Sequence, residues 1–177
     1  MRVFIGLSVP DQLSLELIGI RDRVVAQMAS ASPRPVIAAN FHMTLVFLGE
    51  ISALRKDQVC GAVDQLITLP QERIHLHLDR ASCFPDSGGR ILAAEAAPVP
   101  ALIHLHQGLL KATAQVQDRP LRPHITLARL SRAFIPAPVI PLQLPFQATE
   151  LCLYESRQSE WGVRYRALRR WPLPVTD

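Results

Sequence analysis

We predict from the sequence an α+β protein with two pseudo-symmetric lobes, each an antiparallel sheet with helices on its outer face, and a groove between the lobes. Two observations support this prediction. The segments Phe41–Leu48 and Arg122–Arg129 both have the pattern of a strand that contains His-x-Thr-Leu, 82 residues apart in a chain of 177 residues. In each half of the chain, a strand and a helix precede this repeated strand. We therefore interpret residues 1–177 as a single two-lobed domain.

The first half of the chain is predicted as strand, helix, short strand, strand and helix, over Arg2–Ser8, Asp11–Met28, Arg34–Ala38, Phe41–Leu48 and Ala53–Ile67. Apolar residues recur at helical spacing in both helical segments. Ser52 has the chemistry of an N-cap for the second helix, because its hydroxyl can accept a hydrogen bond from a free backbone N–H group. Pro70 ends that helix.

The second half is predicted as strand, turn, strand, helix and strand, over Glu72–Asp79, Phe84–Gly89, Arg90–Glu95, Ala101–Val116 and Arg122–Arg129. The first of these segments alternates apolar and polar residues, as half-buried strands do. Ser131–Pro145 contains four prolines, which exclude a helix or a central strand, so we expect a surface connection there. Two last strands, Thr149–Glu155 and Val163–Arg169, complete the prediction.

Composition narrows the class of protein. The chain is 49% hydrophobic and 19% charged, enough for a packed core, and its apolar runs are far shorter than the roughly 20 residues of a membrane span. The first ten residues do not resemble a signal peptide, so we predict a cytoplasmic protein. Three scattered cysteines indicate neither a disulfide framework nor a zinc site. A net charge of +4 permits an anionic ligand.

The repeated strands place polar residues together, because alternate side chains on a strand share a face. His42 and Thr44 stand on one face of the first strand, and the opposite, apolar face consists of Phe41, Met43, Leu45 and Phe47. His124 and Thr126 stand together in the same way on the second strand. Two histidines facing each other provide an acid and a base near neutral pH.

Such a pair suits displacement at phosphorus. Opening a cyclic phosphodiester requires a base to deprotonate water and an acid to protonate the departing ribose oxygen, on opposite sides of the phosphate. The hydroxyls of Thr44 and Thr126 can donate to the non-bridging oxygens, which gain negative charge in the transition state. These roles need no metal and no cofactor.

The two motifs, His42-Met43-Thr44-Leu45 and His124-Ile125-Thr126-Leu127, resemble those of the two-histidine phosphoesterase superfamily. More narrowly, the chain resembles the bacterial and archaeal RNA 2′,3′-cyclic phosphodiesterases, historically called 2′–5′ RNA ligases. The opening strand Arg2–Leu7 and the ending Trp171-Pro172-Leu173 are similar too, so the likeness covers the whole chain. The resemblance implies that His42 is the proton donor, that His124 is the proton acceptor and that the product carries a 2′-phosphate.

The choice of phosphate-binding arginine stays open at this point. Strand alternation puts Arg122 beside His124, whereas the family pattern favours Arg129, which a bulge near the strand end could turn towards the site. We rank Arg129 first and Arg122 second. Tyr165 and Phe41 are candidates for stacking on a base, with packing as the preferred alternative.

Three further patterns are weaker. His75 and His77 look like a His-x-His metal pair, but they lie on the polar face of an amphipathic strand with no further ligands nearby, so we expect them in solvent. His104 and His106 point apart on a helix. Gly88-Gly89 indicates a hairpin turn rather than a phosphate loop.

We therefore predict an RNA 2′,3′-cyclic phosphodiesterase that works without a metal, has its active site in the groove between the lobes and is a monomer. Its predicted partner is an RNA or oligonucleotide with a 2′,3′-cyclic phosphate end, and no membrane. Whether it also catalyses the reverse 2′–5′ ligation is left open. The alternatives are a phosphodiesterase for 2′–5′ linkages or small cyclic nucleotides, and a non-catalytic RNA-binding module.

Overall fold

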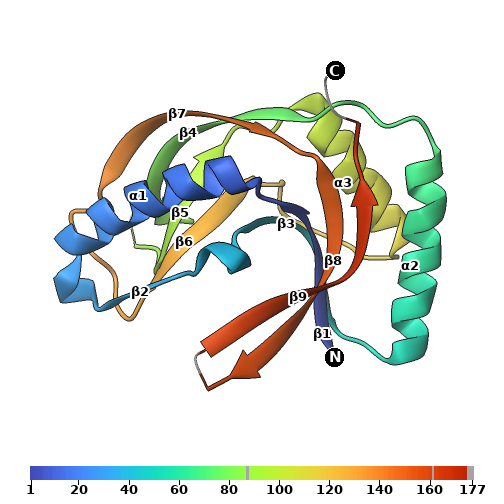
Figure 1. Ribbon diagram of the computed structural model, residues 1–177, viewed down its shortest axis with the longest axis horizontal. Helices are drawn as coiled ribbons and strands as arrows, with labels where there is room; N and C mark the ends of the chain where they lie inside the picture. The colour runs from blue at the N-terminus through green and yellow to red at the C-terminus, as the bar shows by residue number, and fades with distance from the viewer. Residues whose placement is uncertain (87, 161, 175–177) are drawn as a thin grey trace.

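Nine strands form one antiparallel sheet in the computed structural model, which describes residues 1–86, 88–160 and 162–174 (Figure 1). The strands are β1 (Arg2–Ser8), β2 (Pro33–Pro35), β3 (His42–Glu50), β4 (His75–Phe84), β5 (Ile91–Ala96), β6 (His124–Leu130), β7 (Val139–Gln147), β8 (Glu150–Ser159) and β9 (Gly162–Pro172). The helices are α1 (Asp11–Gln27), α2 (Ala53–Thr68) and α3 (Pro100–Ala112), with the 3-10 turns η1 (Ala29–Ala31) and η2 (Ala38–Asn40). No helix in the described residues is both long and apolar enough to span a membrane.

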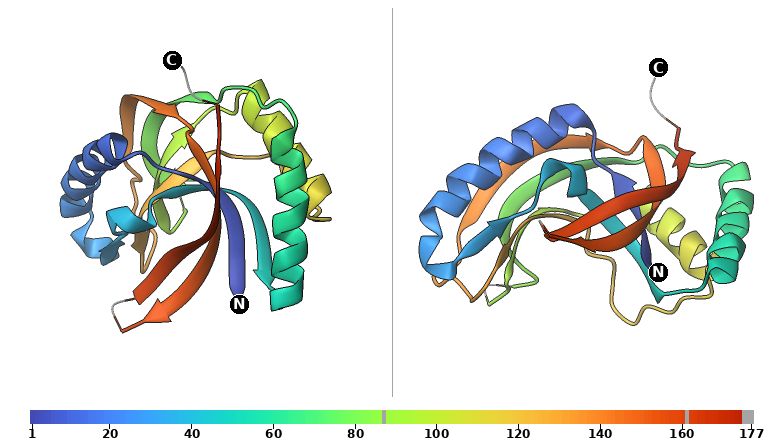
Figure 2. Two further views of the ribbon diagram at one scale, coloured as in Figure 1. Left: turned by 45° about the vertical axis from the view of Figure 1, so that its right-hand side comes forward. Right: turned by 60° about the horizontal axis from the view of Figure 1, so that its bottom comes forward.

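The sheet consists of two lobes that meet at one point. The strand order is β7-β4-β5-β6-β3-β1-β8-β9, and β2 pairs with β6 off this path. The central neighbours β3 and β6 are joined at a single residue pair, Met43 with Ile125. We call β3, β1, β8 and β9 the first lobe, and β7, β4, β5, β6 and β2 the second lobe. The sheet curls around this junction (Figure 2), and the predicted α+β class with two antiparallel lobes is confirmed.

The helices lie on the outside and cross between the lobes. α1 follows β1 of the first lobe but packs on β6 and β2 of the second. α3 follows β5 of the second lobe but packs on β3 of the first, beside α2 (Figure 1). Their buried residues recur at helical spacing, for example Leu13, Leu17 and Val24 of α1. Each strand–helix–strand unit therefore helps to cover the other lobe, which ties the two lobes together.

Two predicted elements differ from the structure. β7 lies where the four prolines predicted a surface connection, and it is the edge strand of the sheet, paired with β4 alone. Pro141 and Pro145 fit there because an edge strand tolerates residues without an N–H donor. α3 ends at Ala112 rather than Val116, since Ala114 takes a left-handed φ of 51° and Gln115 N–H bonds back to Leu110.

Other elements were predicted in the right place, with shifted boundaries. β4 extends to Phe84, five residues beyond the predicted end at Asp79, and the predicted turn Phe84–Gly89 includes residue 87, which lies outside the described residues. Gly89 is required at this turn, since a Cβ atom there would stand 2.0 Å from the carbonyl oxygen of Phe84. Ser52 caps α2 as predicted, accepting a hydrogen bond of 3.1 Å from the N–H of Arg55.

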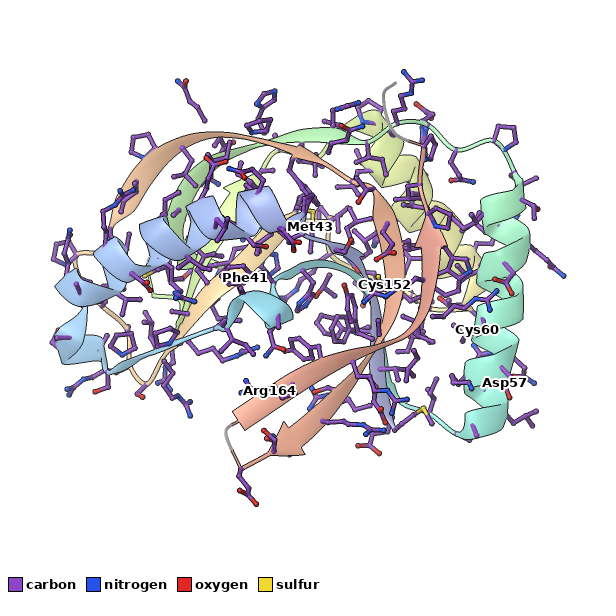
Figure 3. All side chains as sticks on the ribbon, viewed as in Figure 1. Phe41, Met43, Asp57, Cys60, Cys152 and Arg164 are labelled. Atoms are coloured by element: carbon purple, nitrogen blue, oxygen red, sulfur yellow. The ribbon has the colours of Figure 1, made fainter. Side chains whose placement is uncertain are left out.

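Both repeated strands contain a β-bulge at the same place. In β3 the register against β1 shifts at Leu45, and in β6 the register against β5 shifts at Leu127. An extra residue reverses the alternation of faces beyond it. Phe47 is therefore 68% exposed instead of facing the core as predicted, whereas Met43 and Phe41 lie in the interior (Figure 3). Arg129 is exposed at the corresponding position of β6.

Candidate active site

The single bridge between the lobes brings the two predicted His-Thr pairs onto one face. Met43 and Ile125, the bridging residues, are fully buried on the core side. Their neighbours in sequence, His42, Thr44, His124 and Thr126, are half-buried on the other side, which we call the histidine face. In the antiparallel register that the Met43–Ile125 pair sets, His42 is level with Thr126 and Thr44 is level with His124, so the two histidines are diagonal to each other across the junction.

Each imidazole is oriented by a backbone carbonyl two residues before it. His42 Nδ1 lies 2.7 Å from the oxygen of Asn40, and His124 Nδ1 lies 2.8 Å from the oxygen of Arg122. A carbonyl can only accept, so each Nδ1 carries its proton and donates it. Nε2 is then the titrating nitrogen of each ring. His42 Nε2 also lies 3.0 Å from the hydroxyl of Thr44.

Aromatic rings surround His42 in the first lobe. The ring centroids of Phe4, Tyr165 and Tyr154 lie 4.6, 4.8 and 5.7 Å from the imidazole. Burial among them lowers the pKa of His42 to about 4, against the hydrogen bond to Asn40, which favours the charged ring. The positive charges of His124 and Arg129 act in the same direction as burial. His42 is therefore neutral at pH 7 in the free protein.

His124 has a more polar setting in the second lobe. Phe84 stacks on its ring with centroids 4.0 Å apart. Burial lowers the pKa of His124, as for His42, and the positive charge of Arg122 acts in the same direction, whereas the carbonyl of Arg122 and the negative charge of Glu95 oppose that shift. Of the two rings, His124 therefore has the electrostatic support for a positive charge that His42 lacks.

A buried carboxylate organises the surroundings of His124. Glu95 is 5% exposed and stands across from His124 in the β5–β6 ladder. It accepts hydrogen bonds from Ser82 Oγ at 2.5 Å, Arg80 at 3.3 Å and Arg122 at 3.4 Å. Burial raises the pKa of Glu95, but these hydrogen bonds and the two arginine charges outweigh burial and hold it below the usual value. Glu95 is thus an anion on which Arg122 is anchored.

The two candidate arginines are placed differently. Arg122 binds Glu95, and its guanidinium carbon lies 4.6 Å from the centre of the Phe84 ring. Arg129 is exposed on the histidine side of β6, beyond the bulge at Leu127, and has no ion pair or side-chain hydrogen bond with any described residue. Its charge nevertheless lowers the pKa of His42 across the junction. Of the two candidates, Arg129 is therefore the one whose side chain has no anionic partner among the described residues.

Of the two candidate aromatic residues, only Tyr165 lies at the site. It packs edge-on against His42 and against Phe4, with centroids 5.0 Å apart in the second case. Phe41 is 5% exposed and belongs to the core, so it is not placed to stack on a base and the preferred expectation of packing holds. The reason is that Phe41 precedes β3 on the side that packs inwards (Figure 3).

Two residues that sequence reasoning did not single out support the site. Asn40 is 8% exposed; its amide donates to the carbonyl of Val163 at 2.7 Å and accepts from the N–H of Tyr165 at 3.0 Å. It thereby ties β9 to the turn that orients His42. Glu95 is the other such residue. A lone acidic residue within the apolar strand Ile91–Ala96 was the available sequence signal for it.

The remaining polar patterns are not part of the histidine face. His75 and His77 are exposed on β4, and the described part of the chain contains no group of three His, Cys, Asp or Glu side chains placed to hold a metal ion. His104 pairs with Glu72 at 2.7 Å, and His106 lies 3.2 Å from the amide oxygen of Gln117.

Comparisons with known proteins find relatives that match most of the chain. A family model described as the 2'-5' RNA ligase superfamily matches residues 9–160. The RNA 2',3'-cyclic phosphodiesterase of Escherichia coli is 31% identical, over 97% of this chain and 96% of that protein.

Solved structures show the same fold. The crystal structure of E. coli LigT in apo form has a TM-score of 0.79 at 29% identity, and the alignment covers 98% of each chain. A structure of LigT complexed with 3'-AMP has a TM-score of 0.75 at 28% identity, again over 98% of each chain. A Thermus thermophilus protein has a TM-score of 0.84 at 23% identity, with 98% of each chain covered.

The buried His42 ring predicts a specific dependence of stability on pH. The folded protein resists protonation of His42 down to about pH 4, whereas the unfolded chain takes up that proton near pH 6.5. The contribution of His42 to the free energy of unfolding is therefore lost as the pH falls through this window, by about 3 kcal/mol in all. Urea denaturation at pH 7 and pH 4.5 should show a smaller loss for His42→Gln than for the wild type. His77→Gln, an exposed control on β4, should keep the wild-type dependence, and equal losses in all three proteins would contradict the assignment.

Proposed function

The chain belongs to the 2'-5' RNA ligase superfamily, and from this premise we propose that it hydrolyses RNA 2′,3′-cyclic phosphate ends to 2′-phosphomonoesters. Similarity to the E. coli phosphodiesterase over nearly the full length supports the reaction class and RNA as the substrate class. The observation that best supports the mechanism is the diagonal placement of two imidazoles, each held by a carbonyl, on either side of one bridge.

The proposed reaction is an in-line displacement at phosphorus. Nε2 of neutral His124 takes a proton from water, whose oxygen forms the new bond to phosphorus. The bond between phosphorus and the ribose 3′-oxygen breaks, and Nε2 of charged His42 gives that oxygen its proton. The 2′-oxygen stays bonded to phosphorus, so the product is a 2′-phosphate with a free 3′-hydroxyl. The assignment of donor and acceptor follows the family resemblance.

The low pKa of His42 in the free protein is compatible with its role as the acid. Burial and the charges of His124 and Arg129 keep its ring neutral before the substrate binds. A phosphodiester anion between the two lobes opposes those charges and favours imidazolium, so it raises the pKa of His42 in the complex. The substrate thus helps to charge its own acid, and the two limbs of the pH–rate profile belong to the coupled pair.

The other residues of the histidine face stabilise the developing negative charge. The hydroxyls of Thr44 and Thr126 flank the bridge and donate to the non-bridging oxygens. The side chain of Arg129, which has no ion pair or hydrogen bond with another described residue, binds the phosphate directly. Arg122 is anchored on Glu95 and acts through the orientation of His124, whose Nδ1 proton its carbonyl accepts.

The same geometry can serve a 2′–5′ linkage or a small cyclic nucleotide, because the two histidines act on phosphorus and not on the base. We keep the RNA end as the proposed substrate because of the likeness to the E. coli enzyme. We also propose that the protein is a monomer and that it works in the cytoplasm.

The defining test is product analysis on an oligonucleotide that ends in a 2′,3′-cyclic phosphate. We expect a 2′-phosphate end, identified by phosphorus NMR, at a rate that excess EDTA does not change, because each proton and charge role is assigned to a side chain. A 3′-phosphate product, or activity that is lost with EDTA and restored by a divalent metal, would contradict the mechanism.

The roles of the two histidines can be separated with a better leaving group. His42→Ala and His124→Ala should each reduce kcat by roughly 10²–10⁴-fold on the RNA substrate. On an activated aryl phosphodiester, whose nitrophenolate needs no proton, His42→Ala should recover most of its activity and His124→Ala should not. The opposite pattern would reverse the assignment of acid and base.

A third experiment compares the activities of variants at the two candidate arginines. Arg129→Ala should lower kcat/KM by about 10–150-fold, the equivalent of about 1.5–3 kcal/mol for a hydrogen bond to a charged group. Arg122→Ala should cost less, since its guanidinium is already bound to Glu95. Arg73→Ala, in the loop before β4, serves as a matched control without effect. A larger loss in Arg122→Ala than in Arg129→Ala would show that Arg122 is the phosphate ligand.

A further inference from the structure

Glu95 is a buried carboxylate directly beside the proposed base. It is the cross-strand partner of His124 in the β5–β6 ladder, and directly opposed residues have Cβ atoms about 4.5–5.5 Å apart on one face of a sheet. The guanidinium groups of Arg80 and Arg122 and the hydroxyl of Ser82 surround the carboxylate and bury it. A fixed negative charge therefore lies next to one of the two histidine rings.

The internal repeat places a different residue beside the other ring. β1 pairs with β3 as β5 pairs with β6, and the residue across from His42 is Ser8. Ser8 is neutral, and its hydroxyl donates to the carbonyl oxygen of Glu150 at 3.4 Å. Among the described residues, the charges that act on the His42 ring are positive, whereas a carboxylate acts on the His124 ring. Equivalent places in the two lobes thus differ by one negative charge.

The other charged groups around His124 do not cancel the effect of Glu95. The guanidinium groups of Arg80 and Arg122 are 48% and 49% exposed, so water screens their charges more than it screens the buried carboxylate. The charge of Glu95 accordingly raises the pKa of His124, against the effects of burial and of Arg122. The charged or titratable side chains on this part of the sheet, from β3, β4, β5 and β6 with the segment before it, are His42, Asp79, Arg80, Glu95, Arg122 and Arg129.

The proposed reaction moves one proton onto His124 and takes one from His42. As water attacks phosphorus, Nε2 of His124 gains a proton and its ring becomes imidazolium, while His42 gives its proton to the leaving 3′-oxygen. An adjacent carboxylate stabilises the charge that forms on His124. The apolar surroundings of His42 favour the loss of its proton, because a buried ring is more stable when it is neutral. The positive charge therefore moves to the ring on which the protein stabilises it.

We propose that Glu95 is a positioning residue whose negative charge makes His124 the base of the pair. The inference rests on the proposed function, because it concerns the direction in which the protons move. It supplies a physical reason for an assignment that otherwise follows the family resemblance. Buried as it is, Glu95 acts through the His124 ring and not on the substrate. Its hydrogen bonds with Ser82, Arg80 and Arg122 keep the carboxylate ionised and in place.

Titration of the histidine rings in the free protein, followed by NMR, tests the electrostatic effect directly. Glu95→Gln keeps the size of the side chain but removes its charge, so it should lower the pKa of His124. A merely structural role predicts the opposite sign, because loosened packing would expose the ring to water, and burial is what lowers its pKa. Glu95→Asp, which keeps the charge, should stay close to the wild type. Glu155→Gln is the matched control, since Glu155 is also a largely buried carboxylate bound to an arginine, but on β8 of the first lobe; it should leave the His124 titration unchanged.

Turnover tests whether this charge matters for the reaction. A nearby opposite charge changes the proton affinity of a group by about 10- to 1000-fold, and only part of that factor reaches the rate, because the proton is only partly transferred in the transition state. Glu95→Gln should therefore lower kcat on an oligonucleotide ending in a 2′,3′-cyclic phosphate by about 3–30-fold. The loss should be the same on an activated aryl phosphodiester, whose hydrolysis still needs a base. Glu95→Asp should restore most of the rate, and Glu155→Gln should keep the wild-type rate.

The outcomes separate this inference from the proposed function. If the wild type does not hydrolyse the cyclic phosphate, the proposed function fails, and the titration still decides whether Glu95 sets the proton affinity of His124. An unchanged or raised pKa of His124 in Glu95→Gln, or a lowered pKa with an unchanged kcat, would overturn the inference. If Glu95→Gln does not fold, the double variant Glu95→Gln/Arg80→Gln carries the same expectations, because it leaves one cation fewer without its partner.

Discussion

The single bridge between Met43 and Ile125 is the constraint on which the histidine face depends. Both residues are fully buried, so the register of β3 against β6 is fixed by the core and not by the polar residues. A slip of one residue in either strand would turn the histidine of that strand towards the core, where burial disfavours its charged form. Because the ladder stops after one pair, β3 and β6 separate beyond it. A longer ladder would have kept the four polar side chains at ordinary ladder spacing, with less room for a phosphate between the rings.

The core also explains how one backbone pattern provides two different proton carriers. His42 and His124 receive the same carbonyl contact at Nδ1, 2.7 and 2.8 Å long. Their surroundings differ: Phe4, Tyr154 and Tyr165 enclose the first ring, whereas Glu95 and Arg122 stand beside the second. Desolvation and nearby charge therefore separate the protonation behaviour of two chemically identical groups. In the free protein this separation favours a positive charge on His124 over one on His42, so the proposed roles require the bound phosphate to reverse it.

The repeat, the class of fold and the residues that meet at the junction could be predicted from the sequence. The reason is that the alternation of apolar and polar residues in a short segment shows both that it is a strand and which of its faces is buried. The sequence did not predict that Phe47 is exposed, since a bulge reverses the alternation only where two strands pair. The prediction missed β7 because proline is excluded from central strands but tolerated in edge strands, and the sequence does not show which strand lies at an edge. Glu95 and Asn40 act through partners in other strands, so no local pattern could identify their contacts.

The two bulges show how a duplicated framework can serve an asymmetric substrate. The bulges at Leu45 and Leu127 turn the residues that follow them in the same way, so Phe47 and Arg129 take equivalent positions on the two repeated strands. A nucleotide end is not symmetric: phosphorus carries charge on its non-bridging oxygens and a nucleoside on one side only. In the proposed mechanism the acid and the base stand in line across phosphorus, and the repeated strands supply the symmetry that this placement needs. The ligand needs asymmetry in what surrounds them, and side chains on a repeated backbone can supply that without disturbing the placement of the histidines.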